Sequence, residues 1–226
     1  MENQNSQERI PYVEFADNAN ERTPCVLVLD CSGSMRGEPI KQLNAGLAAL
    51  EKELKDDIDA SSRVQLLIIK ASGNDEVTIA SDWTDAMNFT APVMEADGLT
   101  PLGKAMETAL RKIEERKSLY DSCGITSKRP WIFLLSDGEP TDYGWEEAAE
   151  ICRYAQKNKK AVIHTIGTQG ANLDKLAKFS ILPPKRLTGL KFTEFFLWLS
   201  RSVSCISKAA PNADNYMDDI NDWNEK

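Results

Sequence analysis

Two spacings of apolar residues alternate along the chain. Short runs that are apolar at nearly every position, the first of them at 25–29, are followed by longer segments in which apolar residues return every three or four positions. A run that is apolar on both sides suits a strand covered by helices on both faces, and the longer spacing is typical of amphipathic helices. The pattern predicts strands at 25–29, 64–69, 76–80, 131–135, 161–166 and 186–190. It predicts helices at 38–55, 101–117, 143–158, 173–179 and 192–206.

The order of these elements predicts an α/β fold. Strands that alternate with helices favour a mostly parallel sheet, here a six-stranded, Rossmann-like, doubly wound sheet with helices on both faces. The turn-forming residues at 72–75 join two strands as a hairpin, so 76–80 is expected to be an antiparallel edge strand. In such sheets ligands bind beyond the carboxyl ends of the strands. The short polar sequences after Leu29 and Leu135 are therefore the first candidates for a site.

One domain is expected to account for most of the chain. Residues 1–23 are mainly polar and are expected to form a lead-in, and residues 24–207 are expected to form a single α/β domain. Within it, the segment 81–98 has no clear period and is expected to be irregular. Residues 208–226 are expected to form an acidic, flexible tail.

The balance of charge excludes several classes of partner. The chain has 27 Lys and Arg against 35 Asp and Glu, a formal net charge of −8, whereas non-specific binding to nucleic acid or to an anionic membrane needs a basic surface. His164 is the only histidine in the chain, so catalysis that needs an exposed imidazole is nearly excluded. The five scattered cysteines form no CxxC pair, which favours free thiols over a zinc cluster. The sequence shows neither an apolar run of about 18 residues nor an apolar leader, so a cytoplasmic location is expected.

Hydroxyl and carboxylate side chains stand at three points that the fold would bring to one edge of the sheet. The first strand ends in Asp30, and the hydroxyls of Ser32 and Ser34 follow on either side of a glycine that lets the loop curl. Asp137 follows the end of a later strand, and Thr100 precedes a helix that begins with proline. Oxygen ligands without histidine or thiol suit a hard cation such as Mg²⁺, Mn²⁺ or Ca²⁺.

These residues resemble the metal-ion-dependent adhesion site of von Willebrand factor A (VWA) domains. The family pattern is DxSxS, then a threonine in a loop, then an aspartate at the end of a later strand. The matching sequences here are DCSGS at 30–34, GLTP at 98–101 and SDGEPTD at 136–142. The resemblance covers residues 24–207 and implies the VWA fold. Within the family, LDCSGSMRGEPI at 29–40 is similar to intracellular bacterial members, notably the TerY-like group associated with tellurium resistance.

The resemblance implies a role for each matched residue. Ser32 and Ser34 would bind the ion directly, Thr100 directly or through water according to the conformational state, and Asp30 and Asp137 directly or through water. The sixth position would be left for a carboxylate of a partner protein, and binding would be coupled to a shift of the last helix. The implied function is a non-enzymatic interaction module of the bacterial cytosol that uses Mg²⁺. The partners implied are kinase- or phosphatase-type signalling proteins, or other components of a stress or defence system.

Two other readings stay open. A metal-dependent phosphohydrolase would use Asp30 as nucleophile or ligand, but phosphoryl transfer needs charge neutralisation, and the only candidate cations near the site are Arg36 and Lys104. The chain also lacks a P-loop and a DxD pair at the strand end. The second reading is a structural subunit with a vestigial metal site, in which Asp30 and Asp137 merely cap helices and tighten turns.

Several further residues have structural interpretations. Asp142 stands where the cap of the following helix is expected, and His164 is expected to be a satisfied core residue. Cys31 is expected to be a spectator between two ligands, because no basic neighbour is certain to lower its pKa. Trp83 and Phe89 either line a partner surface or cover the core under a long loop.

Overall fold

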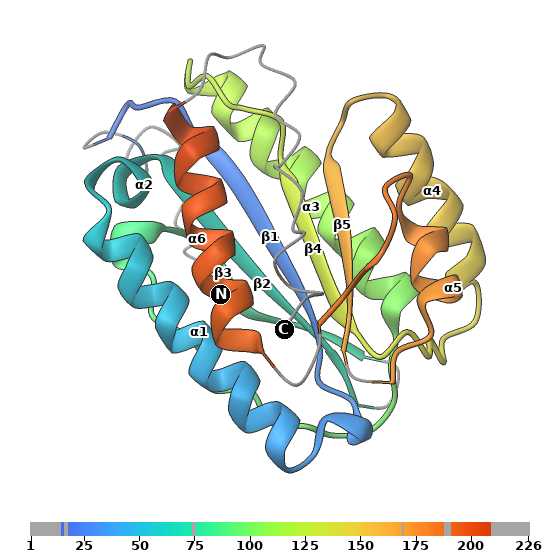
Figure 1. Cartoon of the computed structure of the whole chain (residues 1–226). Coiled ribbons are helices and arrows are strands. Elements are labelled where there is room, and N and C mark those ends of the chain that lie inside the picture. Colours follow the sequence, from blue (N-terminus) through green and yellow to red (C-terminus); the bar gives the residue numbers. More distant parts are fainter. Residues whose placement is uncertain (1–14, 16–17, 74–75, 169, 188–190, 209–226) are drawn as a thin grey trace, which may run out of the picture.

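The computed structural model describes residues 15, 18–73, 76–168, 170–187 and 191–208. Six strands form one sheet in the order β3-β2-β1-β4-β5-β6 (Figure 1). All neighbouring strands are parallel except β2 and β3, which form an antiparallel pair at one edge. The strands are β1 (Thr23–Asp30), β2 (Val64–Ser72), β3 (Glu76–Asp85), β4 (Trp131–Ser136), β5 (Val162–Gly167) and β6 (Lys185–Arg186). The predicted mixed sheet with one antiparallel edge strand is confirmed.

Helices cover both faces of this sheet, as the sequence predicts. α1 and α6 lie side by side on one face, and α3 and α4 pack together on the other (Figure 1). The helices are α1 (Glu38–Asp56), α2 (Ile58–Arg63), α3 (Leu102–Ser122), α4 (Trp145–Lys157), α5 (Leu173–Leu176) and α6 (Phe192–Lys208). Three 3₁₀ turns are η1 (Gly33–Met35), η2 (Ala86–Asn88) and η3 (Ala177–Phe179).

The sheet divides the apolar core into two parts. β1 is buried along its whole length, and its side chains alternate between the two sides. Leu27 packs into the cluster shared with α1 and α6, and Val28 packs into the cluster shared with α3 and α4. Because packing on both faces fixes each side chain of β1, the residue at the end of the strand, Asp30, has a well-defined position.

Neither α2 nor the second half of β3 is predicted from the sequence, and α3 continues to Ser122, five residues beyond its predicted end. α2 follows α1 after one residue, Asp57, whose carboxylate accepts hydrogen bonds of 3.0 Å from the backbone N–H groups of Asp59 and Ala60. This short helix buries only Ala60, so it has no apolar period by which a sequence could reveal it. β3 continues to Asp85 within the segment expected to be irregular, and a register shift against β2 near Ile68 disturbs its alternation.

The described residues at the N-terminal boundary of the domain pack against its body. The side chain of Arg22 is fully buried, and its guanidinium donates to the backbone carbonyl of Ser62 at 2.7 Å. Phe15 packs against Tyr120, with ring centroids 5.6 Å apart. The apolar patch at 10–13 lies outside the described residues.

The C-terminal predictions are only partly described. β6 has two residues, and positions 188–190 of the predicted edge strand lie outside the described residues. α6 continues through Lys208, two residues beyond the predicted end at 206. The predicted tail after Lys208 also lies outside the described residues.

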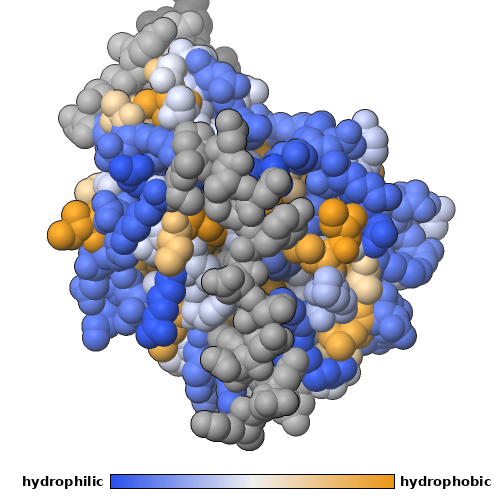
Figure 2. Space-filling model, turned by 45° about the horizontal axis from the view of Figure 1, so that its top comes forward, coloured by the Kyte–Doolittle hydropathy of each residue, from blue (hydrophilic) through white to orange (hydrophobic). Residues whose placement is uncertain are grey.

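The surface of the molecule is mainly hydrophilic. Figure 2 shows hydrophobic side chains in small, separate groups among hydrophilic ones. Single exposed apolar residues are normal for a folded protein and need no special role. Among the described helices, none combines the length and the apolar character needed to span a bilayer.

Candidate functional site

The ends of β1 and β4 place two polar side chains next to each other. β1 and β4 are neighbours in the sheet with Leu29 in register with Leu135, so the next residues, Asp30 and Ser136, also lie side by side. The Ser136 hydroxyl donates a hydrogen bond of 2.6 Å to Oδ2 of Asp30. Strand order reverses between these two strands, and the carboxyl ends at such a point form the usual ligand-binding crevice of an open α/β sheet.

The loop after β1 curls back over the Asp30 carboxylate. The backbone N–H of Ser32 donates to Oδ1 of Asp30 at 2.9 Å, and this contact fixes the start of the loop. The hydroxyl oxygens of Ser32 and Ser34 lie 3.0 Å apart. The Ser34 hydroxyl also donates to Oδ2 of Asp137 at 2.6 Å, although 103 positions separate them in the chain. Four of the five predicted site residues therefore meet in one cluster.

Thr100 stands on a loop that contacts the first loop through the backbone. The N–H of Gly33 donates to the carbonyl of Gly98 at 3.0 Å. Thr100 also exchanges two hydrogen bonds with Thr141: its N–H donates to the Thr141 hydroxyl at 2.9 Å, and its carbonyl accepts from the Thr141 N–H at 3.0 Å. Within the described part of the chain, no hydrogen bond joins the Thr100 hydroxyl to the other four residues.

Gly98 allows this loop to approach so closely. Its φ angle is +63°, a left-handed conformation that residues with a Cβ rarely adopt. A Cβ at this position would lie 2.5 Å from the carbonyl oxygen of Gly73, at the end of the neighbouring hairpin. The backbone geometry that places Thr100 beside the first loop therefore requires a glycine here.

Burial sets the electrostatics of Asp30. Its side chain is 1% exposed, and burial raises the pKa of its carboxyl. Hydrogen bonds from Ser136 and Ser32 act in the opposite direction and lower that pKa, while the negative charge of Asp137 raises it. Two carboxylates that share one small site repel each other, and a cation between them would relieve this repulsion.

The spacing of the oxygen atoms fits the shell of a small cation. Ligands at about 2.1 Å in octahedral geometry lie about 3 Å from their neighbours. The hydroxyl and carboxylate oxygens that link Ser32, Ser34 and Asp137 are 2.6–3.0 Å apart. The described residues include no group of three or more His, Cys, Asp or Glu side chains suited to a metal, so hydroxyl oxygens would have to supply part of the shell.

Ser136 is a positioning residue that sequence analysis did not single out. Its hydroxyl donates to Asp30 and accepts from the backbone N–H of Gly138 at 2.9 Å, which ties the end of β1 to the loop after β4. The side chain is fully buried. Its role depends on the register of β1 against β4, and the only signal in the sequence is a hydroxyl residue directly before Asp137.

The expectation for Asp142 was wrong in detail. It does not cap the helix that follows it, α4, whose preceding residue is Gly144. Its carboxylate instead accepts from the backbone N–H groups of Gly103 and Lys104 at 3.3 and 2.9 Å, and so caps the start of α3. Because Thr100 lies just before α3, Asp142 helps to hold the threonine loop beside the cluster.

The other singled-out residues are structural. Burial raises the pKa of the Cys31 thiol to about 12, which agrees with the expected spectator role. Phe89 is fully buried in the core, and Trp83 is half-buried with Arg116 placed 5.8 Å from its ring. His164 is buried as expected, but its Nε2 has no hydrogen-bond partner among the described residues, so it is not satisfied.

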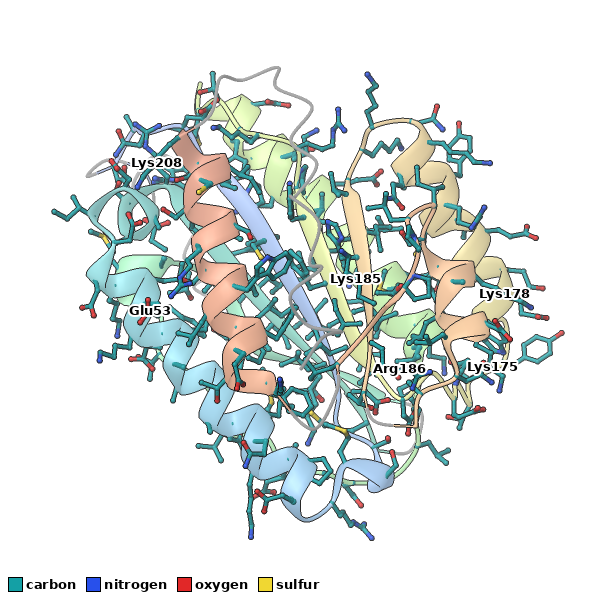
Figure 3. All side chains as sticks on the ribbon, viewed as in Figure 1. Glu53, Lys175, Lys178, Lys185, Arg186 and Lys208 are labelled. Carbon is teal, nitrogen blue, oxygen red and sulfur yellow. The ribbon has the colours of Figure 1, made fainter. Side chains whose placement is uncertain are left out.

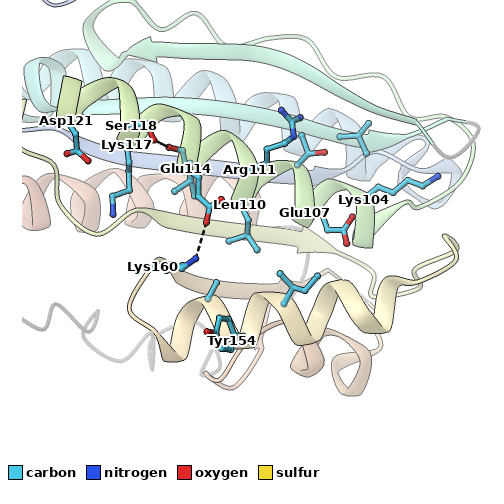
Figure 4. Close-up of a pocket in the computed structure, with 15 residues that line it drawn as sticks. Lys104, Glu107, Leu110, Arg111, Glu114, Lys117, Ser118, Asp121, Tyr154 and Lys160 are labelled. Atoms are coloured by element: carbon cyan, nitrogen blue, oxygen red, sulfur yellow. Dashed lines mark hydrogen bonds and ion pairs between the residues drawn. The ribbon is translucent and has the colours of Figure 1, made fainter. Parts of the chain in front are cut away.

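A groove on the surface lies away from this cluster. A groove of about 1000 Å³ runs between α3 and α4 (Figure 4). It is lined by Leu110, Ile151 and Tyr154 and crossed by an ion pair of 3.1 Å between Lys160 and Glu114. None of the five predicted site residues lines this groove. A single ion held by loop oxygens needs no large cavity, so the strand-end cluster remains the candidate site.

The strand order and the helices on both faces define the class of doubly wound α/β domains, in which ligands usually bind at the carboxyl ends of the strands. Within that class, a family model for the von Willebrand factor type A domain matches residues 25–194. The chain therefore belongs to the von Willebrand factor type A domain family, whose members typically mediate protein–protein interactions and often bind a divalent cation. A search among curated proteins gave no match.

Solved structures show the same fold at low sequence identity. The BatB protein from Bacteroides thetaiotaomicron is 15% identical, with a TM-score of 0.53 over 83% of this chain and 100% of that one. The domain of the type V pili tip protein Mfa5 from Porphyromonas gingivalis is 12% identical, with a TM-score of 0.57 over 87% of this chain and 99% of that one. Proximal thread matrix protein 1 from the mussel byssus is 12% identical, with a TM-score of 0.57 over 83% of this chain. This chain spans 49% of the mussel protein's length.

Proposed function

We propose that this VWA domain is a cation-dependent protein-interaction module. Ser32, Ser34, Asp30, Asp137 and Thr100 would hold one divalent cation, with Mg²⁺ as the expected ion. The observation that carries the proposal is a linked set of hydrogen bonds. The Ser32 N–H donates to Asp30, and the hydroxyls of Ser32 and Ser34 and the carboxylate of Asp137 follow with oxygens 2.6–3.0 Å apart. These side chains come from two loops that are far apart in the sequence.

The charge of the cluster supports an acidic partner. Only Asp30 and Asp137 are carboxylates, and the other ligands proposed are neutral hydroxyls. Where Asp30 and Asp137 contact the ion through water, its direct ligands are neutral hydroxyls, so an incoming Asp or Glu of a partner would gain a strong charge-assisted contact. In this arrangement the chain's own residues bind and orient, and they leave one position for the partner's carboxylate.

The biological setting is proposed from the motif alone. The sequence at 29–40 is similar to that of the TerY-like group, which supports a role in a bacterial stress, signalling or defence system within the cytoplasm. Partners of the kinase or phosphatase type follow from the same resemblance.

A non-enzymatic role is favoured over phosphoester hydrolysis. Arg36, one of the two candidate cations, forms an ion pair of 2.9 Å with Asp97 that is largely exposed. The other, Lys104, lines the groove between α3 and α4, which none of the five proposed ligands lines. Phosphoryl transfer depends on positive groups aimed at the phosphate. Hydrolysis of a generic phosphoester with Mg²⁺, lost on Asp30→Asn, would contradict the non-enzymatic role.

Titration calorimetry with Mg²⁺ and Mn²⁺ tests the metal site directly. The native chain should bind one ion, and Asp137→Asn should weaken binding at least tenfold because it removes one of two carboxylates. Glu139→Gln is the matched control, since it removes the same charge from an exposed residue that pairs with Lys175. Binding that is absent, or that is equally strong in Asp137→Asn, would favour a structural subunit with a vestigial site.

Affinity purification tests the interaction separately. Proteins captured by the native chain in Mg²⁺ should be lost from the double variant Ser32→Ala, Ser34→Ala and lost on chelation. The double variant Ser118→Ala, Ser122→Ala provides a control, because both hydroxyls are exposed on α3. Capture of the same proteins by all three chains would count against a cation-dependent interaction.

A further inference from the structure

An aromatic surface lies on β4 and β5, on the side of the sheet that also carries α1 and α6. It consists of Trp131, Phe133 and His164, which we call the β4–β5 face. The His164 ring lies 5.3 Å from Phe133 and 5.2 Å from Trp131, centroid to centroid. All three are buried, with exposed fractions of 2% for Trp131, 0% for Phe133 and 8% for His164.

α6 covers one side of this face. Phe195 and Trp198 of α6 reach Phe133, with ring centroids 6.2 and 6.4 Å away, and Trp131 belongs to the same apolar cluster as this helix. Figure 1 shows α1 and α6 over the side of the sheet that β1, β2 and β3 form, and no described helix over β5 on this face. His164, on β5, is therefore the part of the face where a further segment would pack.

The end of α6 lies beside one end of this face. The Lys128 ammonium donates to the backbone carbonyl of Ile206, near the end of α6. Lys128 stands three positions before Trp131, so α6 ends beside the start of β4. Figure 3 shows Lys208 at this end of the helix. Eighteen residues follow Lys208, whereas β5 lies only two strand spacings, about 10 Å, from β1.

The sequence of 213–223 is strongly amphipathic when read with helical spacing. Its apolar residues fall within a stripe of about 120° on a helix, and the acidic residues occupy the opposite side. The apolar residues are Ala213, Tyr216, Met217, Ile220 and Trp223. The acidic residues in and beside this segment are Asp214, Asp218, Asp219, Asp222 and Glu225. Eleven residues of helix measure about 16 Å, close to the roughly 20 Å of a six-residue strand such as β4.

Basic residues border the face where an acidic segment would lie. Arg129 stands two positions before β4, and the buried Lys128 that precedes it forms an ion pair of 3.5 Å with Glu21. Lys185 is in register with Ile166 on β5 and therefore points to the same side as His164 (Figure 3). Its charge reaches His164, because burial first and Lys185 second lower the pKa of that imidazole. The charges of the border and of the segment are thus of opposite sign.

We propose that residues 213–223 form a helix that docks on the β4–β5 face of the same chain. The apolar stripe covers His164, and the acidic side meets the basic border. The docked helix would cover β4 and β5 on the face where α1 and α6 cover the other strands. A docked helix replaces the flexible tail that composition predicts, and it is independent of the cation site.

His164 is a site-specific probe of this contact, because it is the only histidine in the chain. Diethyl pyrocarbonate acylates a neutral, accessible imidazole, and mass spectrometry reads the modification at His164. In the full chain with Ile220→Asp, the modification rate should rise at least tenfold over the native chain. Asn215→Asp is the matched control, since it adds the same charge on the polar side of the segment and should leave the rate unchanged.

Equal rates in the three chains would overturn the proposal. An increase with Tyr12→Asp, in the apolar patch at 10–13, but not with Ile220→Asp would assign the face to the N-terminal segment and would also overturn it. Circular dichroism of each variant, unchanged from the native spectrum, excludes global unfolding as the cause of faster modification.

Hydrogen exchange on the native full chain provides a measurement without any variant. Amides at 214–224 should exchange at least tenfold more slowly than in a synthetic peptide of residues 209–226, because a docked helix protects them. Exchange at the rate of the peptide would overturn the proposal even if every variant failed to fold.

Discussion

At the scale of single residues, the buried carboxylate of Asp30 in the candidate site lowers the stability of the folded protein. Its carboxylate is buried at the end of β1, and burial raises its pKa. Hydrogen bonds from Ser136 and Ser32 reduce this effect without removing it. A group with a raised pKa in the folded state makes folding less favourable as the pH rises through the unfolded and then the folded pKa.

Asp30→Asn is therefore expected to stabilise the metal-free protein at neutral pH. An amide keeps the shape of the side chain and removes the buried charge, and we expect Tm to rise by about 2–4 °C, or roughly 1 kcal/mol for a domain of this size. The gain should shrink as the pH falls toward the unfolded carboxyl pKa of about 3.9, where the native side chain also becomes neutral. Calorimetry from pH 4 to 7.5 measures this, and a lower Tm at pH 7.5 would contradict it.

His164 gives the opposite dependence on pH. Burial lowers the pKa of its imidazole to about 4, with Lys185 as the second cause, whereas an unfolded histidine titrates near 6.5. Between these values the unfolded chain binds more protons, so stability is lost as the pH falls through this window. The loss from this group amounts to about 3 kcal/mol. In His164→Phe it should be absent, and denaturant unfolding from pH 4 to 7.5 would contradict this if both chains changed alike.

At the scale of elements, α2 depends on one capping residue that also serves another helix. The Asp57 carboxylate accepts from two backbone N–H groups at the start of α2. It also accepts from the hydroxyl of Ser204 on α6 and forms an ion pair of 3.4 Å with Lys208. The short helix thus links the end of α1 to the end of α6.

Asp57→Ala is expected to reduce the free energy of unfolding by about 1–2 kcal/mol, the usual cost of a lost helix cap. The half-exposed ion pair with Lys208 should add little, because solvent screens it. Asp57→Asn keeps the capping oxygen and should cost less than half as much. Urea unfolding of both variants gives the comparison, and equal losses would show that the charge, rather than the cap, is important.

At the scale of the whole molecule, the sequence predicts the sheet and the site to different degrees. The alternation of apolar runs with helical spacing predicts the α/β class. The motif predicts Asp30 and Asp137 as residues of the site. The role of Ser136 and the cap that Asp142 gives to α3 depend on strand register and on which loops meet, and these are long-range properties. α2 is not predicted from the sequence, because a short helix with one buried residue has no repeated spacing of apolar positions.

A cation at the candidate site should stabilise the entire fold, because it would bind only where two distant loops are held together. At a Mg²⁺ concentration one hundred times Kd, the gain is about 2.7 kcal/mol, or a rise in Tm of about 5–10 °C. Asp137→Asn should abolish the rise, and Glu139→Gln should keep it. Thermal unfolding with and without Mg²⁺ measures it, and a similar rise in both variants would contradict specific binding.

The anchoring of α6 at one end has a mechanical consequence. Near its last turn, the helix is held by the guanidinium of Arg63, which donates to the carbonyl of Ser207 at 3.4 Å, by Lys128 at the carbonyl of Ile206 and by Asp57 at Ser204. A helix that is held at one end can tilt about that end more easily than it can slide along its own axis. Displacement of α6 should therefore grow toward Phe192. Removal of these three contacts would allow the helix to slide along its own axis instead of tilting about its last turn.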